Sequence, residues 1–196
     1  MANGALLAQF PLLHSLLLSR RGVGVLARLA PEGMGRRLST TTFSALAALQ
    51  LLATFWLWSP SSAGAWRASG ALGIALIAAH VLAWVFLVVA LHDAGLGLQT
   101  GWIGWRALLQ GREPAYPPMP QRGLFALCRQ PIYLGFLLVL WTGPTWSADR
   151  LALGGVWGVY CLLAPKLKER RHARIHGEKF ADYRRRVPYM IPRMFA

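Results

Sequence analysis

Acidic residues and cysteines are scarce in this sequence. Only 7 of its 196 residues are Asp or Glu, against 21 Lys or Arg, so the formal net charge is +14. Charged residues of both signs make up 14% of the chain, whereas soluble proteins average about a quarter. Hydrophobic residues reach 55%. This composition excludes an ordinary soluble domain and predicts an all-α integral membrane protein.

Other absences narrow the choice further. The two cysteines, Cys128 and Cys161, are too few for a disulfide framework, and both lie in or beside apolar segments, where a thiol acts as a small hydrophobic group. No metal site is expected, because His172 and His176 have no Cys or second His pair near them in sequence. The first residues lack the basic region and cleavage site of a signal peptide, so we expect them to remain as a helix.

Long hydrophobic runs are what the sequence has instead. A helix needs about 20 apolar residues to cross a ~30 Å hydrocarbon core, although shorter ones cross where the bilayer thins. We therefore predict one membrane domain over residues 1–196 with about five spans. The last two spans are short and form a helical hairpin around Gly143 and Pro144. The predicted spans are residues 5–19, 43–58, 71–91, 133–146 and 151–164.

The basic residues predict an orientation for these spans. Nineteen of the 21 Lys and Arg lie in residues 20–41, 92–131 and 166–193, and only Arg67 and Arg150 lie in the other connections. Because cytoplasmic loops are rich in Lys and Arg, the N-terminus is predicted outside and the C-terminus in the cytoplasm. The net charge of +14 is then explained by the Lys and Arg residues that accumulate in cytoplasmic loops of a membrane protein. Membrane lipids, and not nucleic acid, are the expected partners.

Two polar clusters interrupt this pattern. In the long connection 92–133, Arg129 to Tyr133 stand at the mouth of a predicted span, where polar groups tend to pair or to line a site. The alternative is that Arg129 only reaches the lipid headgroups and Pro131 only starts a helix. The tail 166–193 is predicted to continue the last span as a cytosolic helix that breaks at Gly177.

Glu169 is the unusual residue of the tail. It lies among basic residues where the last span leaves the bilayer, and contact with anionic lipids explains the basic residues but not an acid. An acid there suits a ligand that carries hydroxyl or amino groups. We expect Arg129 to Tyr133 and Glu169 to Tyr183 to meet at one level, at the membrane surface.

The ordered motifs of the chain resemble a known family, the membrane-embedded S-adenosylmethionine-dependent methyltransferases that include isoprenylcysteine carboxyl methyltransferase and the phospholipid methyltransferases. That family has Arg-His-Pro-x-Tyr-x-Gly before a hairpin and a Glu-Glu pair after it, then Gly-x-x-(Tyr/Phe)-x-x-Tyr, Val-Pro and Ile-Pro. The matching segments here are Arg129 to Gly135, Lys168-Glu169, Gly177 to Tyr183, Val187-Pro188 and Ile191-Pro192.

The resemblance extends toward a bacterial branch, the methanethiol S-methyltransferase and NnrU-type proteins, through His14-Ser15, Trp56 to Pro60, the segment from His92 to Gln99, and Trp141 to Thr145. It implies a bacterial inner-membrane enzyme that transfers methyl from S-adenosylmethionine to a small or lipophilic acceptor, with a thiol or carboxylate favoured. The implied cofactor-binding residues are Gly95, Gly97, Gln99, Arg129, Gln130, Pro131, Tyr133, Gly135, Glu169 and Tyr183. Arg129 and Arg186 are the implied catalytic residues, which would orient an anionic acceptor.

Two positions depart from the family pattern. Gln130 stands where the family has His, and Lys168 stands where it has the first Glu of the pair. Glutamine can donate and accept hydrogen bonds but cannot act as a base. The departures keep open a non-catalytic membrane accessory protein of the NnrU type. An NADPH-dependent reductase related to sterol reductases is a further alternative, although such chains have more spans. The identity of the acceptor and the oligomeric state are open.

Overall fold

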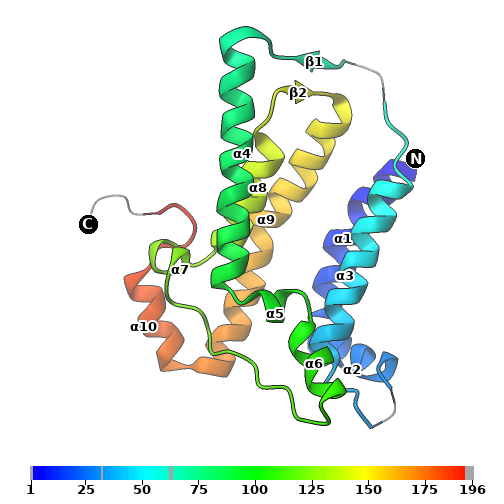
Figure 1. The fold of residues 1–196 in the computed structure, drawn as a ribbon, viewed down its shortest axis with the longest axis vertical. Helices are drawn as coiled ribbons and strands as arrows, with labels where there is room; N and C mark the ends of the chain where they lie inside the picture. Colours follow the sequence, from blue (N-terminus) through cyan, green and yellow to red (C-terminus); the bar gives the residue numbers. More distant parts are fainter. Residues whose placement is uncertain (1, 32, 62–63, 193–196) are drawn as a thin grey trace. The chain divides into compact units, whose positions relative to one another are not determined.

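The computed structural model describes residues 2–31, 33–61 and 64–192, and most of this part of the chain is helical (Figure 1). It contains ten helices and two strands of two residues each, which confirms the prediction of an all-α protein. Arg193, at the end of the predicted basic tail, lies outside the described residues. The chain divides into two compact units, Met1–Ser59 with Ala94–Pro118, and Pro60–Asp93 with Met119–Ala196.

The first unit contains a helical hairpin with short helices at its end. Its described helices are α1 (Ala2–Leu17), α2 (Arg20–Leu29), α3 (Ser39–Trp56), α5 (Leu96–Gln99) and α6 (Trp102–Leu109). The Gln9 amide joins α1 to α3 by donating to the buried Thr54 hydroxyl at 2.7 Å. Helix α1 ends just before Ser19, whose side chain accepts the Gly22 N–H and so caps α2.

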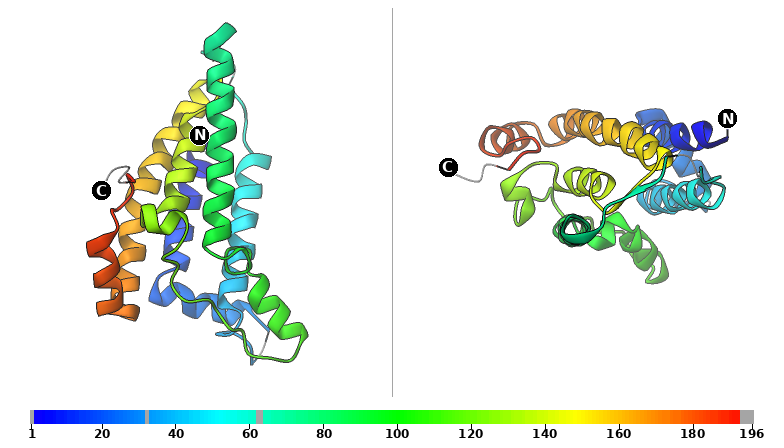
Figure 2. Two further views of the ribbon diagram at one scale, coloured as in Figure 1. Left: turned by 60° about the vertical axis from the view of Figure 1, so that its left-hand side comes forward. Right: turned by 90° about the horizontal axis from the view of Figure 1, so that it is seen from above.

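The second unit is built around three long helices. Its elements are β1 (Trp66–Arg67), α4 (Gly70–Asp93), α7 (Leu124–Leu127), α8 (Pro131–Trp141), β2 (Thr145–Trp146), α9 (Ala148–His176) and α10 (Glu178–Arg186). Helix α8 lies between α4 and α9 (Figure 2). Gly135 permits this packing, because a Cβ there would lie 3.0 Å from the Leu87 Cα of α4. The strands β1 and β2 pair antiparallel at the far end of the hairpin, a feature that the sequence did not predict.

Helix α4 has the properties of a membrane span. Within the described residues it is the one helix both long and apolar enough to cross a bilayer, with 24 residues. Large apolar side chains such as Ile74, Leu82 and Val88 are more than half exposed. A helix that is hydrophobic all round and yet mostly exposed suits lipid better than water. The predicted span 71–91 agrees closely with α4, whereas the count of five spans stays a prediction.

The predicted hairpin is present, but its first helix is placed differently from the prediction. Helix α8 ends at Trp141 and not at residue 146, because the chain turns at Gly143 and then forms β2. Its 11 residues extend only about 16 Å. Helix α9 continues past the end of the predicted span at residue 164 and runs to His176, as predicted for the start of the tail. The predicted break at Gly177 is confirmed, with a positive φ of 49° at that residue.

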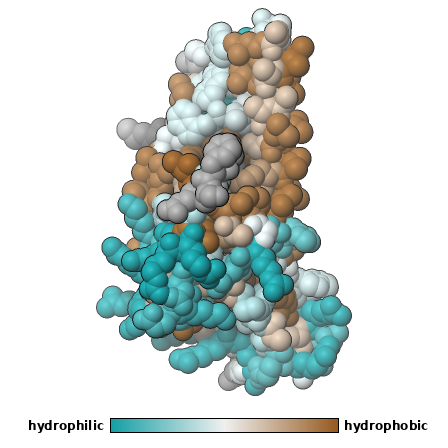
Figure 3. All heavy atoms as spheres, turned by 90° about the vertical axis from the view of Figure 1, so that its left-hand side faces the viewer, coloured by the Kyte–Doolittle hydropathy of each residue, from teal (hydrophilic) through white to brown (hydrophobic). Residues whose placement is uncertain are grey.

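Polar and apolar side chains separate along the second unit. In Figure 3, hydrophilic side chains gather at the end that carries α10, and hydrophobic side chains cover much of the face beyond it. Helix α10 has three consecutive arginines, Arg184 to Arg186, in its last turn, all of them exposed. This separation agrees with a tail that lies outside the bilayer.

Candidate functional site

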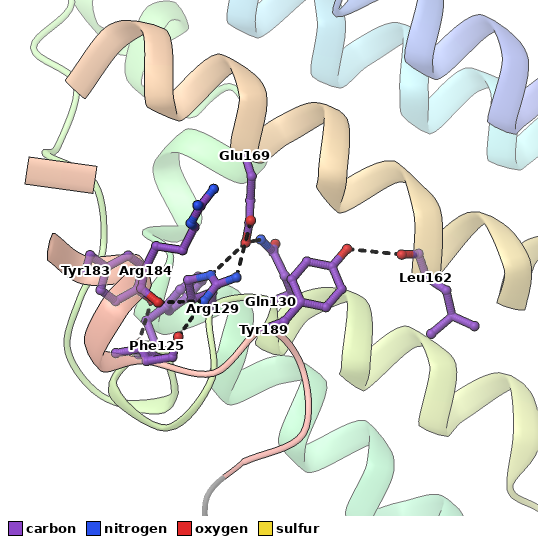
Figure 4. Close-up of polar contacts among 9 residues, drawn as sticks. Phe125, Arg129, Gln130, Leu162, Glu169, Tyr183, Arg184 and Tyr189 are labelled. Atoms are coloured by element: carbon purple, nitrogen blue, oxygen red, sulfur yellow. Dashed lines mark hydrogen bonds and ion pairs between the residues drawn. The ribbon is translucent and has the colours of Figure 1, made fainter. Parts of the chain in front are cut away.

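A polar cluster forms where α8 begins beside the last third of α9. Arg129 Nε donates to Glu169 Oε1 at 2.8 Å, and Arg129 Nη2 donates to Glu169 Oε2 at 3.3 Å (Figure 4). Gln130 Nε2 also donates to Glu169 Oε1, at 3.0 Å. The side chains of Arg129 and Glu169 are only 10% and 13% exposed. The expected meeting of the two polar segments is therefore confirmed for these three residues.

Arg129 also holds the end of α10. Its Nη1 donates to the carbonyl oxygens of Val187, at 2.5 Å, and Arg184, at 3.1 Å. Its backbone N–H donates to the Pro188 carbonyl at 2.9 Å. A cationic side chain is well placed there, since the last carbonyls of a helix carry partial negative charge. All three guanidinium nitrogens are thus engaged, so we interpret Arg129 as a residue that positions Glu169 and α10.

Tyrosines close the same region. The Tyr183 hydroxyl donates to the Phe125 carbonyl at 2.6 Å, and the ring packs with Phe180 and Val187. Burial raises the pKa of Tyr183, so its hydroxyl stays protonated and remains a donor. Tyr189 lies against Arg129, with the guanidinium carbon 5.7 Å from its ring centroid, and donates its hydroxyl to the Leu162 carbonyl.

The start of α7 is fixed from α4. Asp93, the last residue of α4, accepts the Leu124 N–H at 2.8 Å. Gly123 precedes it with a φ of +59°, and a Cβ at Gly123 would lie 2.2 Å from an Asp93 carboxylate oxygen. The segment that carries Phe125 and Arg129 is therefore attached to α4 at a place where only glycine fits. Sequence reasoning missed Asp93, because its partner lies 31 positions along the chain.

One acceptor in this cluster has no partner. The Gln130 residue is 3% exposed, and its Oε1 makes no hydrogen bond within the described part of the chain. The amide orientation follows from Glu169, since a carboxylate only accepts and therefore requires the Nε2 side of the amide. A buried carbonyl oxygen without a donor costs roughly 1–3 kcal/mol. Gln130 Oε1 is thus a buried acceptor whose capacity for a hydrogen bond is unused within the described residues.

Three other residues that were predicted for the site, Pro131, Gly135 and Arg186, do not contact Glu169 through a hydrogen bond in the described part of the chain. Pro131 occupies the first turn of α8 and is fully buried, as expected for a residue that starts a helix. Gly135 is covered by Leu87, so it serves the contact between α4 and α8. Arg186 is exposed on the last turn of α10, and the hydrogen bonds to Glu169 described above come from Arg129 and Gln130.

The remaining predicted residues belong to the first unit. Gly95 precedes α5 with a φ of +89°, a conformation that favours glycine. Gly97 lies against Ile103, because a Cβ there would be 3.0 Å from that side chain. Gln99 ends α5 and is exposed. Within their unit the two glycines serve turn and packing, and their predicted role in cofactor binding stays a prediction.

Lys168 was singled out only as a departure from the family pattern, yet it is part of this region. Its Nζ lies 5.8 Å from the ring centroid of Phe125 and 5.9 Å from that of Tyr133. Burial and the positive charge of Arg171 lower the pKa of Lys168 to about 8, against the opposing effect of Glu169. The sequence does contain a signal for Lys168, because this lysine stands where the family has the first Glu of its Glu-Glu pair.

Proteins of known name are similar to this chain over nearly its full length. Methanethiol S-methyltransferase 2 of Bradyrhizobium diazoefficiens is 30% identical over 200 residues, covering 100% of this chain and 74% of the relative. Methanethiol S-methyltransferase of Crocosphaera subtropica is 30% identical over 194 residues, covering 95% and 72%. Nurim of Xenopus laevis is 29% identical over 140 residues, covering 66% and 48%. No family model and no solved structure matches the chain.

Proposed function

Because the chain belongs to the family of membrane methyltransferases that includes the methanethiol S-methyltransferases, we propose that it transfers methyl from S-adenosylmethionine to a small or lipophilic acceptor. The family resemblance predicted from the motifs is confirmed. The proposed acceptor group is a thiol or a carboxylate, and the names of the relatives favour a thiol. The observation that carries the proposal is the buried Gln130 carbonyl, unpartnered beside the Arg129–Glu169 pair.

The polar groups of the cluster fit this methyl donor. S-adenosylmethionine carries an α-ammonium group and an adenine amine, and Gln130 Oε1 can accept an N–H from either. Glu169 already accepts three hydrogen bonds from Arg129 and Gln130. A carboxylate has about four lone-pair sites, so one remains for a ribose hydroxyl or an amine. Arg129 fixes this carboxylate in place through two of those hydrogen bonds.

The residues of the chain contribute position and electrostatics. When bound, S-adenosylmethionine supplies an electrophilic methyl on a sulfonium, which an acceptor attacks in line. The protein then has to orient the two reactants and exclude water, which lowers the barrier through proximity and a fixed polar environment. The Arg129–Glu169 pair holds the first turn of α8 and the end of α10 together around the cluster. Arg186, exposed beside it, is the group proposed to attract an anionic acceptor.

The proposal includes a place in the membrane. We propose five spans in a bacterial inner membrane, with the N-terminus outside and the polar cluster on the cytoplasmic side. The apolar, exposed helix α4 and the alternating placement of Lys and Arg support this orientation. A lipophilic acceptor would then approach along the hydrophobic face shown in Figure 3, while the soluble donor enters from the cytosol.

Binding of the donor by the purified full-length protein in detergent tests the proposal. Calorimetry with S-adenosylmethionine and S-adenosylhomocysteine should give micromolar affinity, with NADPH as the comparison ligand. Gln130→Leu should weaken binding about 10-fold, because one hydrogen bond to a charged donor contributes ~1.5–3 kcal/mol. Gln110→Leu, on the exposed end of α6, is the matched control.

Each outcome has a defined meaning. Donor binding that depends on Gln130, followed by methyl transfer to methanethiol or another small thiol, supports the enzyme. Binding of NADPH in place of the donor would establish the reductase alternative. Binding of neither compound by a folded protein would leave the accessory role. Retention of the unfolding temperature in Gln130→Leu separates lost binding from lost folding.

A further inference from the structure

Lys168 replaces the first Glu of the family's Glu-Glu pair, and the proposed binding of the donor gives it no role. Lys168 precedes Glu169 on α9, and successive helix residues point about 100° apart. Glu169 contacts Arg129 and Gln130, whereas the Lys168 ammonium lies over the rings of Phe125 and Tyr133. Tyr133 is three residues after Gln130, in the same first turn of α8. The ammonium group therefore lies beside the first turn of α8, next to the polar cluster.

The groups around Lys168 come from four helices. Its own helix presents Glu169, Arg171 and, one turn later, His172. Helix α8 presents the Tyr133 phenol, and α7 presents the uncharged ring of Phe125. Helix α10 contributes Phe180, whose centroid lies 5.8 Å from that of His172. The buried His172 Nδ1 has no hydrogen-bond partner within the described residues, which gives this region a second unpartnered polar atom besides Gln130 Oε1.

Burial and charge set the protonation of this group. Removal from water and the neighbouring Arg171 both disfavour the ammonium form, and they bring the pKa of Lys168 to about 8. An ordinary lysine has a pKa of about 10.4 and is almost entirely charged at neutral pH. With a pKa of about 8, a sizeable fraction of Lys168 is a neutral amine at pH 7.5. A neutral amine can accept a proton.

We propose that Lys168 is the base that removes the proton from a thiol acceptor before methyl transfer. This inference rests on the proposed function, and it specifies a thiol, and not a carboxylate, as the acceptor. The S–H bond of the thiol breaks and its proton forms a new N–H bond on Lys168 Nζ, which leaves a thiolate beside an ammonium ion. The thiolate electron pair then forms the bond to the methyl carbon, while the electron pair of the old bond stays on the donor sulfur. Lys168 finally returns its proton to water.

The step is chemically matched. Thiolate, and not thiol, is the reactive nucleophile, and a free thiol is mostly protonated at neutral pH, since even the cysteine thiol has a pKa of about 8.5. A base works best when its pKa lies near that of the group it deprotonates and near the working pH. A carboxylate acceptor is already ionised at neutral pH and needs no such base. The lysine is therefore a functional difference between this chain and family members that carry an acid at this position.

Neighbouring groups are less suited to the same step. The Arg129 guanidinium has only N–H donors, and these are engaged with Glu169 and with backbone carbonyls. The carboxylate of Glu169 is held by Arg129 and Gln130. Burial and the charges of Lys168, His176 and Arg171 lower the pKa of His172 to about 4, which makes it a weak base. The Tyr183 hydroxyl donates to a carbonyl and has a raised pKa.

The pH dependence of methyl transfer tests the proposal. In the wild-type protein kcat/KM for methanethiol should rise with pH, with its midpoint near pH 8, where half of Lys168 is the neutral amine. Lys168→Met should lower kcat/KM about 100-fold at pH 7, since a general base contributes roughly 10²–10⁴. The deficit should shrink toward pH 10, where the free thiol ionises by itself. Lys168→Arg should not rescue, and Lys179→Met, an exposed residue of α10, should behave as wild type.

A second readout needs no turnover. The chain has only three lysines, Lys166, Lys168 and Lys179, so reductive ¹³C-methylation should give three NMR signals, assigned with Lys→Arg variants. The signal that disappears in Lys168→Arg should titrate with a midpoint near 8, and its assignment by that variant separates it from the signal of the N-terminal amine. An unchanged pH profile in Lys168→Met, with donor binding and transfer intact, would refute the base and leave the methyltransferase standing. Absence of donor binding in the wild type refutes both.

Discussion

Arg150 near the start of α9 and Arg129, which contacts Glu169 in the last third of α9, are both fixed by backbone carbonyls and an aromatic ring, yet only the surroundings of Arg129 carry the proposed ligand site. At the hairpin end, Arg150 donates to the carbonyls of Thr145 and Val139 and lies 5.0 Å from the Trp146 ring. At the other end, Arg129 donates to the carbonyls of α10 and lies over Tyr189. The local geometry of the two arginines is therefore similar.

The difference is the acid. Arg129 also pairs with Glu169, which draws Gln130 into the cluster and leaves the Gln130 carbonyl buried and unpartnered. Arg150 contacts carbonyls and a ring, and its Nε is buried without a hydrogen-bond partner within the described residues, but the neighbouring Asp149 accepts the Ser61 N–H and does not pair with it. An arginine that closes a turn needs no carboxylate. The combination of a carboxylate and an unpartnered amide is what distinguishes a ligand site from a structural contact.

Replacing Arg129 and Arg150 in turn by alanine should give the largest difference between the two arginines in stability and in donor binding. Arg129→Ala leaves Glu169 nearly buried without its cation, which costs about 3–5 kcal/mol when a buried pair is broken. We expect a large loss of the free energy of unfolding together with loss of donor binding. Arg150→Ala should destabilise by less and leave donor binding intact. Denaturant unfolding in detergent and calorimetry measure both, and equal effects of the two variants would contradict the comparison.

Glycines next to the two ends sharpen the contrast. Gly123 and Gly143 both have positive φ, but a Cβ at Gly123 would lie 2.2 Å from the Asp93 carboxylate, whereas one at Gly143 would lie 2.9 Å from the flexible end of Arg150. Gly123→Ala should cost roughly 2–3 kcal/mol and reduce donor binding, because it displaces the segment that carries Arg129. Gly143→Ala should cost about 1 kcal/mol and spare binding. Thermal unfolding and calorimetry of the two alanine variants decide this.

The polar end should also respond to pH through Lys168. The pKa of Lys168 is about 8 in the folded protein and about 10.4 in the unfolded chain, so the unfolded state binds more protons between these values. The stability penalty is therefore fully present below pH 8 and fades as the pH rises to about 10.4. Lys168→Met should be more stable than wild type at pH 7, and the difference should vanish near pH 10.5. Lys179→Met, as the control, should track the wild type throughout.

Much of this arrangement was predictable from sequence, because it depends on local patterns. The continuous charge of the tail and Gly177 located the end of α9, and the paired motifs brought Arg129 to Glu169. Long apolar runs also predicted the helices α1, α3, α4 and α8 and the first part of α9. These features need little knowledge of which side chain faces which neighbour.

What sequence could not predict depends on long-range packing. The packing of Gly135 against Leu87, where α8 meets α4, is one such contact, and the role of Gly135 in cofactor binding stays a prediction. The cap that Asp93 provides to α7, and the pairing of β1 with β2, join segments that carry no local signal for each other. The position of Lys168 over the rings of Phe125 and Tyr133 likewise depends on which face of α9 packs against α7 and α8.

The smallest effect is expected at Arg186, the other residue predicted to be catalytic. It is exposed on α10, so Arg186→Ala should change the free energy of unfolding by less than about 0.5 kcal/mol. If it attracts an anionic acceptor, the variant should raise KM for a carboxylate-bearing thiol at low salt and leave KM for methanethiol unchanged. Added salt should remove the difference, since charges exposed to water are screened over about 10 Å at 0.1 M. Arg185→Ala, exposed one residue earlier and facing Asp182, is the matched control. Equal KM shifts in both variants would mean that the net charge of α10, and not Arg186 itself, attracts the acceptor.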